Sequence, residues 1–152
     1  MWIFALLGNG LFLLATLVAS IRCLTLWRRT RQSPELVAGL GFFLVAGVGY
    51  PLLAISGIDG RSVADVDPWL LGAGLGFISL GLVSLQHFTR QTFHAGQGWT
   101  IAPVALTCLA AVVVCWGSVR AMLVAPPDMP PLEAAQVWML GVRLIFEAWY
   151  VW

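Results

Sequence analysis

An arginine and a glutamate lie inside a strongly apolar stretch near the end of the sequence, "GVRLIFEAWYVW". Arg143 and Glu147 are four residues apart, so they share one face of a helix. In a helix that begins near residue 132, Arg143 would lie about 18 Å deep, close to the middle of a bilayer. A charge at that depth costs at least about 2.5 kcal/mol, which makes it a candidate functional residue. The alternative is a structural ion pair that orients the helix, and the sequence favours neither interpretation.

The other polar residues of the predicted helix 132–152 lie on the same face as the pair. At 100° per residue, this face is about 100° wide, and Trp138, Trp149 and Trp152 fall on the opposite side. Its polar residues are Glu133, Gln136, Arg143, Glu147 and Tyr150. The charges are therefore expected to point toward protein or a water-filled cavity. The candidate partners on other helices are Asn9, Ser79 and Thr107. The predicted intramembrane polar site consists of Asn9, Gln136, Arg143, Glu147 and Tyr150.

The histidines and cysteines do not form a pattern that indicates a metal or cofactor site. His87 and His94 are seven residues apart, and no cysteine or acid that would complete a metal site lies near them. Cys23, Cys108 and Cys115 include no Cys-x-x-Cys pair, which argues against a thiol oxidase. Without any lysine, this chain cannot form a retinal Schiff base. The sequence thus predicts no cofactor and favours a protein that is not an enzyme.

The composition is that of a membrane protein. Hydrophobic residues make up 60% of the 152 residues and charged residues 10%, whereas a soluble domain has about 25% charged residues. A water-soluble domain of this size cannot bury so much apolar surface. A net charge of +1 is too small for a nucleic-acid-binding surface. We therefore expect residues 1–152 to form a single transmembrane domain, with the lipid bilayer as its main partner and no nucleic-acid partner.

Five segments are long and apolar enough to cross a bilayer, which needs about 20 residues. The predicted spans are 2–27, 36–55, 69–87, 101–123 and 132–152. The connections between them are short, so successive helices are expected to pack antiparallel. Residues 1–21 contain no charged side chain and do not resemble a signal peptide. The predicted fold is an all-α, polytopic transmembrane helix bundle.

The arginines predict the orientation of the bundle, because cytoplasmic loops are enriched in positive charge. The arginines expected on one side are Arg22, Arg28, Arg29, Arg31 and Arg90. The arginines expected on the other side are Arg61 and Arg120, which are accompanied by several acids. This distribution places the N-terminus outside and the first and third loops in the cytoplasm of a bacterial inner membrane.

Small residues mark faces where helices can approach closely. Gly72 and Gly76 form a G-x-x-x-G pattern, and Ser79 continues the same face. A second such stripe consists of Thr107, Ala111, Cys115 and Ser118. We interpret these stripes as helix-packing surfaces, with a polar pathway as the alternative. The glycine-rich span 36–55 is expected to kink or to contact another helix near Tyr50–Pro51.

The stretch "RRTRQSPELVAGLGFFLVAGVGYPL", together with "FEAWYVW", resembles an uncharacterised family of bacterial membrane proteins with seven spans. The residues that carry the resemblance are Arg28, Arg31, Pro34, Glu35, Gly49, Tyr50, Pro51, Glu147 and Tyr150. The resemblance implies a multi-span architecture and no particular activity. In that family a basic loop and two further helices follow, so we expect the natural chain to continue beyond Trp152.

These observations favour a multi-pass inner-membrane protein without a catalytic site. We expect a sensory or scaffolding membrane module, or an accessory subunit that packs against other membrane helices or subunits. The alternative is a small transporter or channel whose pathway follows the polar face of the fifth span. A membrane enzyme is the least favoured class, because the sequence contains no pair of nucleophile and base.

Overall fold

The computed structural model describes residues 2–60, 62–94, 96, 98, 101–136, 140 and 141, with only the backbone described for residues 2–9. In chain order the elements are α1 (Trp2–Thr30), α2 (Ser33–Phe42), the π-helical segment η1 (Phe43–Gly49), α3 (Tyr50–Ile55), the 3₁₀ turn η2 (Val63–Asp65), α4 (Pro68–Phe93) and α5 (Ile101–Val124). A further helical turn covers residues 131–136. The described residues contain no β-strand, so the expected all-α fold is confirmed.

Four of the described helices are long and apolar enough to cross a membrane. They cover Gly10–Thr30, Ser33–Ile55, Pro68–Phe93 and Ile101–Val124. These helices correspond to the first four predicted spans. The fifth predicted span, 132–152, lies mostly outside the described residues.

Three helices are longer than the sequence predicted, and one of them is α1, which ends at Thr30 instead of residue 27. α4 continues to Phe93 instead of ending at residue 87, and α2 begins at Ser33 instead of residue 36. The predicted bounds followed the fall in hydropathy, whereas a helix ends where its backbone hydrogen bonds end. Threonine, arginine and glutamine are tolerated within a helix, and Pro34 suits a first turn because its missing N–H is not needed there. All three extensions lie at the same end of the molecule.

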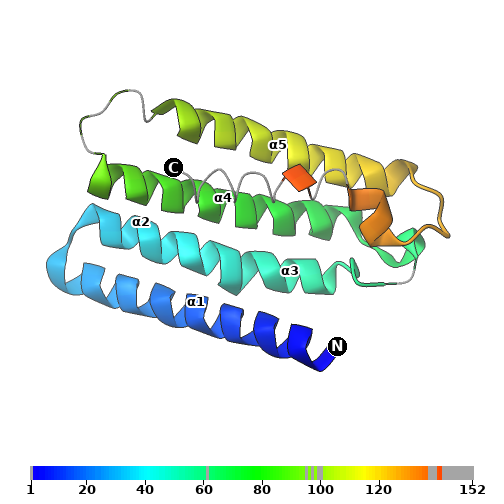
Figure 1. The fold of residues 1–152 in the computed structure, drawn as a ribbon, viewed down its shortest axis with the longest axis horizontal. Coiled ribbons are helices and arrows are strands. Elements are labelled where there is room, and N and C mark those ends of the chain that lie inside the picture. Colours follow the sequence, from blue (N-terminus) through cyan, green and yellow to red (C-terminus); the bar gives the residue numbers. More distant parts are fainter. Residues whose placement is uncertain are drawn as a thin grey trace.

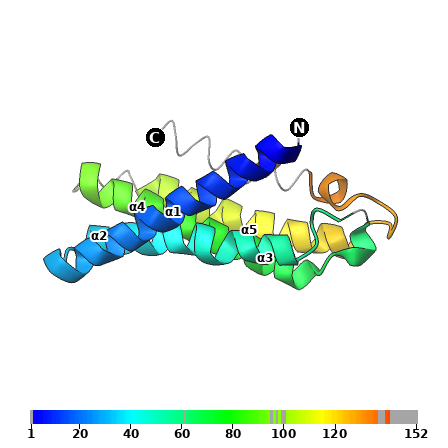
Figure 2. The same cartoon turned by 90° about the horizontal axis from the view of Figure 1, so that it is seen from below.

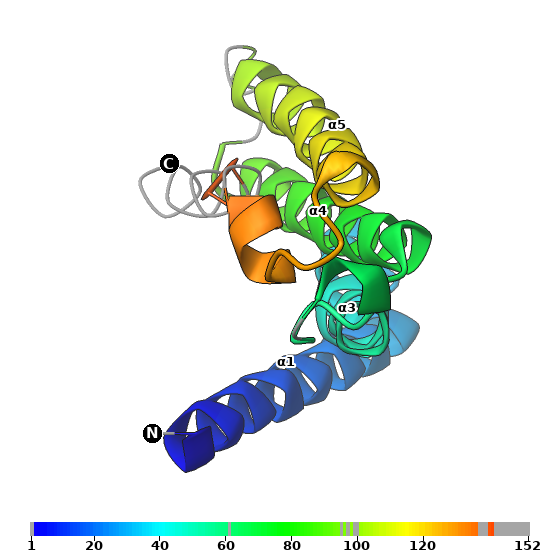
Figure 3. The ribbon, with the colours of Figure 1, turned by 90° about the vertical axis from the view of Figure 1, so that its right-hand side faces the viewer.

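The helices form a row in the order α1, α2–α3, α4 and α5 (Figure 1). α1 packs against α2 and η1, the continuous rod from α2 to α3 packs against α4, and α4 packs against α5. The other two views show that α1 crosses its neighbour obliquely and that the row bends (Figure 2, Figure 3). Of the four described spans, α4 is the most enclosed, with 44% of its most apolar 18 residues buried, compared with 11% for α1.

Two loops close the end of the row opposite the turn between α1 and α2 (Figure 1). The backbone N–H of Val63 donates to the carbonyl oxygen of Met129 at 2.9 Å, and the hydroxyl of Ser62 donates to the carbonyl oxygen of Pro127. The side chain of Asp67 caps the N-terminus of α4. Beneath these loops lies a buried cluster of Ile58, Val63, Val66, Leu71, Leu75, Met122 and Ala135. This end of the described bundle is therefore held by both hydrogen bonds and an apolar core.

The second span contains a π-helical segment immediately before Pro51. Pro51 has no N–H to donate to the carbonyl oxygen of Gly47, one turn earlier, and its ring crowds that carbonyl. The N–H of Tyr50 donates to the carbonyl oxygen of Val45, five residues before it, which is the π-helical pattern. The wider turn lets the helix continue through the proline.

Glycines bring the backbones of the second span and α4 into close contact. A Cβ atom on Gly49 would lie 2.5 Å from Cγ1 of Ile78 and 3.1 Å from the carbonyl oxygen of Gly74. A Cβ atom on Gly81 would lie 2.6 Å from the carbonyl oxygen of Gly41. The close helix contact expected near Tyr50–Pro51 is therefore present at Gly49.

Candidate functional site

Most of the predicted intramembrane polar site lies outside the described part of the chain. Arg143, Glu147 and Tyr150 are not among the described residues, and Asn9 is described only by its backbone, within α1. The side chain of Gln136 is exposed on the helical turn that follows α5. The polar site therefore remains a prediction from the sequence.

The predicted packing residues of α4 have three different environments. Gly72 faces α5 so closely that a Cβ atom there would lie 2.5 Å from Cγ2 of Val119. Ser79 is buried, and its hydroxyl lies 4.0 Å from the sulfur of Cys115 on α5. Gly76, in contrast, has open space where a Cβ atom would be. The α4–α5 contact is therefore tight at Gly72 and opens into a groove at Gly76.

The groove between α4 and α5 has a volume of about 700 Å³ and an almost entirely apolar lining. Small side chains, including Gly76 and Ala73 from α4 and Ala111 from α5, form its floor, and the exposed rings of Trp69 and Trp116 flank it. None of the described residues that line it is charged. This groove suits apolar groups, such as lipid chains or apolar side chains.

A smaller pocket with polar walls lies at the other end of α4, and we call it the basic-end pocket. Its volume is about 410 Å³, and it is lined by Ser33, Pro34, His87, Arg90, Gln91, His94 and Gly96. Nε2 of Gln91 and Nε2 of His87 lie 3.0 Å apart and share a hydrogen bond. No group of three or more metal-ligating side chains occurs among the described residues. The pocket therefore presents hydrogen-bonding and cationic groups.

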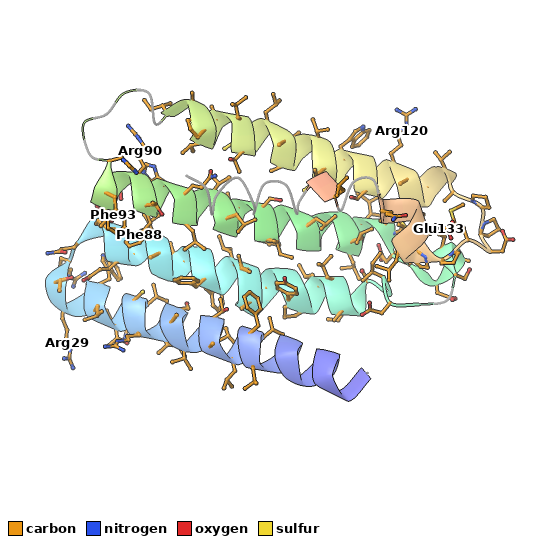
Figure 4. All side chains as sticks on the ribbon, in the orientation of Figure 1. Arg29, Phe88, Arg90, Phe93, Arg120 and Glu133 are labelled. Carbon is orange, nitrogen blue, oxygen red and sulfur yellow. The ribbon has the colours of Figure 1, made fainter. Side chains whose placement is uncertain are left out.

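The charged residues separate toward the two ends of the described bundle. Arg28 and Arg29 lie in the last turn of α1, and Arg31 directly follows the helix. The guanidinium of Arg31 lies 5.5 Å from the ring centroid of Trp27. Figure 4 shows Arg29 and Arg90 at this end, with Arg120 and Glu133 at the opposite end. The described acids of the opposite end are Asp59, Asp65, Asp67, Asp128 and Glu133. The first end is therefore basic and the second mainly acidic.

The sequence placed several buried polar side chains on shared helix faces but could not identify their partners. The hydroxyl of Ser20 on α1 donates to the carbonyl oxygen of Gly39 on α2 at 2.8 Å. Oε1 of Gln86 and the hydroxyl of Ser118 are buried without a hydrogen-bond partner. The polar stripes in the sequence included Ser118 but could not show which groups would be satisfied.

No family model matches the chain, and neither a curated protein nor a solved structure matches it. The resemblance to a seven-span membrane family therefore remains a prediction.

Proposed function

We propose that the protein is a multi-pass membrane module without a catalytic site of its own, which acts as a scaffold or sensor or as an accessory subunit of a membrane complex. The observation that carries this proposal is the open row formed by the described helices, in which α1 packs mainly against the second span. Large apolar side chains remain exposed along α1 and α5, including Leu14, Ile21, Leu106 and Val112. Such faces suit contact with lipid and with the helices of partner subunits.

The polar side chains within the described spans support a structural role for these helices. The hydroxyls of Thr16, Ser84 and Thr107 donate to the carbonyl oxygen four residues earlier in their own helix. Ser20 donates to the neighbouring helix. Donation to backbone is the usual way in which an isolated hydroxyl is accommodated within a helix, so these four side chains fit a structural role.

The proposal includes five spans in a bacterial inner membrane, with the N-terminus outside. The separation of charge between the two ends supports this orientation, because positive residues are retained on the cytoplasmic side. The basic end, which carries Arg28, Arg29, Arg31 and Arg90, would then face the cytoplasm.

A transporter or channel is the second candidate, and the charged pair in the sequence favours it. Arg143 and Glu147 share a predicted face at mid-bilayer depth, where ionisable residues commonly mark ion or proton pathways. In this alternative, the pathway would follow the polar face of the fifth span.

The test measures two properties of the protein: whether it is part of a larger particle, and whether it passes ions or protons. The natural protein, tagged at its own locus, would be extracted in a mild detergent, and the protein mass of the particle would be measured by light scattering. The proposed function predicts a particle heavier than one chain, which separates into single chains in a harsher detergent. Purified chains in vesicles should then pass no ions or protons above the level of empty vesicles.

The opposite result would be single copies in the mild extract that conduct ions or protons once they are in vesicles. A matched variant, Arg143→Met with Glu147→Leu, identifies the route in that case. If the pair lines a pathway, the flux disappears while the protein remains folded and inserted. That outcome would replace the scaffold proposal with the transporter.

A further inference from the structure

The basic-end pocket joins the beginning of one span to the end of another. Ser33 and Pro34 belong to the first turn of α2, whereas His87, Arg90 and Gln91 belong to the last two turns of α4. The two helices run antiparallel and pack against each other. The pocket therefore depends on the fold and is not a feature of one loop.

One face of α4 provides most of the polar groups. His87, Arg90, Gln91 and His94 follow the spacing i, i+3, i+4 and i+7, so their side chains project from the same side of the helix end. The guanidinium of Arg90 has five N–H donors in a planar fork that matches the oxygens of a phosphate or carboxylate. This face therefore favours an anion.

The N-terminus of the second span adds the positive end of a helix dipole to the pocket. Its helix runs from Ser33 to Ile55, and the side chain of its N-cap residue, Gln32, makes no hydrogen bond to the first turn. The positive end of a helix dipole attracts anions. Of the two α2 residues that line the pocket, Ser33 has a backbone N–H, whereas Pro34 has none. Glu35 is the acid nearest in sequence, but it does not line the pocket, and the hydroxyl of Thr30 donates to its carboxylate.

The side-chain amide of Gln91 has one polar atom without a hydrogen-bond partner. Its Nε2 is paired with His87, whereas its Oε1 is buried and has no hydrogen-bond partner. A buried carbonyl oxygen without a donor costs free energy. Because this oxygen is closed to solvent, a hydroxyl or ammonium group of a ligand would pair with it only after the Gln91 side chain rotates.

The size and position of the pocket also fit a phosphate-bearing group. Its volume of about 410 Å³ lies within the range of small-molecule sites, roughly 300–1,000 Å³. It lies at the end of a span, where headgroups lie if the helices cross a bilayer. Phe93, beside it at the end of α4, is 71% exposed, as an apolar side chain in contact with the lipid interface would be.

We propose that the basic-end pocket binds a phosphate-bearing anion, with Arg90 as the principal charged contact and the first turn of α2 as the second. The phosphate comes from the headgroup of an anionic phospholipid or from a soluble phosphate compound. The lipid source rests on the proposed membrane topology, whereas the phosphate chemistry does not. Binding would join the ends of α2 and α4 and stabilise this end of the bundle.

The experiment uses the purified full chain in detergent and counts bound lipids by native mass spectrometry. Phosphatidylglycerol and phosphatidylcholine with the same acyl chains are offered in equal amounts. We expect preferential retention of phosphatidylglycerol, and inorganic phosphate should displace it. The variant Arg90→Gln should weaken retention roughly tenfold, as expected for the loss of a charge-assisted hydrogen bond.

Arg29→Gln is the matched control, because it removes the same charge from the same end of the molecule. Arg29 lies on the outer side of α1, away from Arg90 (Figure 4), so retention should stay within about twofold of the unchanged protein. Equal losses in the two variants would show a diffuse basic surface and overturn the proposal. Arg90→Lys, which keeps the charge but loses the planar fork, should have an intermediate effect.

Measurements on the unchanged protein keep the test decisive if Arg90→Gln does not fold. If inorganic phosphate raises the melting temperature while the two lipids are retained equally, the site is a phosphate site with a soluble source. If there is neither lipid preference nor stabilisation by phosphate, the proposal is overturned. Both readouts are independent of the assembly and flux measurements, so the failure of one proposal would not be mistaken for the failure of the other.

Discussion

Gly41 and Gly81 face each other where the second span crosses α4, and a Cβ atom on Gly81 would lie 2.6 Å from the carbonyl oxygen of Gly41. Backbone cannot move aside as a flexible side chain can, so even one methyl group must push the helices apart. Gly81→Ala should therefore lower the free energy of unfolding by about 1–3 kcal/mol. Thermal or denaturant unfolding in detergent micelles would measure this change.

Gly76→Ala is the control for that prediction, because it places the same methyl group on the same helix in open space. Alanine also has a higher helix propensity than glycine. The free energy of unfolding should stay unchanged or rise by up to about 1 kcal/mol. Equal destabilisation by the two substitutions would show that the crossing at Gly81 is not tight.

The hydrogen bond from Ser20 to the carbonyl oxygen of Gly39 is expected to hold α1 to the second span. Ser20→Ala should destabilise the protein by about 0.5–1.5 kcal/mol, because it leaves a buried carbonyl oxygen without this donor. Ser84→Ala is a suitable comparison, since the hydroxyl of Ser84 bonds only within its own helix, to Leu80. The two variants would be compared by unfolding, and a Ser84 effect as large as that of Ser20 would contradict the assignment.

The buried cluster at the acidic end should contribute strongly to stability. Leu71 has 0% of its surface exposed, so Leu71→Ala is expected to cost about 2–5 kcal/mol through the cavity it creates. Leu80, on the same helix, is 53% exposed, and Leu80→Ala should cost about 0.5 kcal/mol or less. Melting temperatures of the two purified variants test this difference, and similar values would show that the cluster is not a core.

The charged pair near the chain end gives a prediction that comes from the sequence alone. If Arg143 and Glu147 form a structural ion pair, Arg143→Met together with Glu147→Leu should leave an inserted, folded protein. Either single substitution should be worse by roughly 3–5 kcal/mol, because it leaves one buried charge without its partner. Yields of membrane-inserted protein and unfolding curves would separate these cases. A double variant that is as defective as the single variants would contradict a pairing of these two residues.

The sequence predicted the helical fold and the first four spans because long apolar segments can satisfy their backbone only as helices in a bilayer. It did not predict that α4 extends to Phe93, because hydropathy falls before the backbone hydrogen bonds end. The contact between Gly41 and Gly81 was also missed. Each glycine was visible, but their pairing depends on the crossing of two helices, which a single sequence does not specify.

The basic-end pocket could have been anticipated only in part. The spacing of His87, Arg90, Gln91 and His94 along one helix face was a usable signal, but the two histidines were interpreted only as possible metal or cofactor ligands. Ser33 and Pro34, which complete the pocket, lie more than 50 residues away in the chain. Their proximity follows from the antiparallel packing of α2 and α4.

The membrane topology tests the account most directly, because both the proposed function and the lipid source of the phosphate depend on it. Reporters that are active only outside or only inside the cell would be fused after Arg31, Gly60, His94 and Asp128. The account predicts cytoplasm, exterior, cytoplasm and exterior, in that order, since the basic end remains inside. The reverse order would contradict the orientation, and the same side for Arg31 and Gly60 would contradict a membrane-spanning second helix.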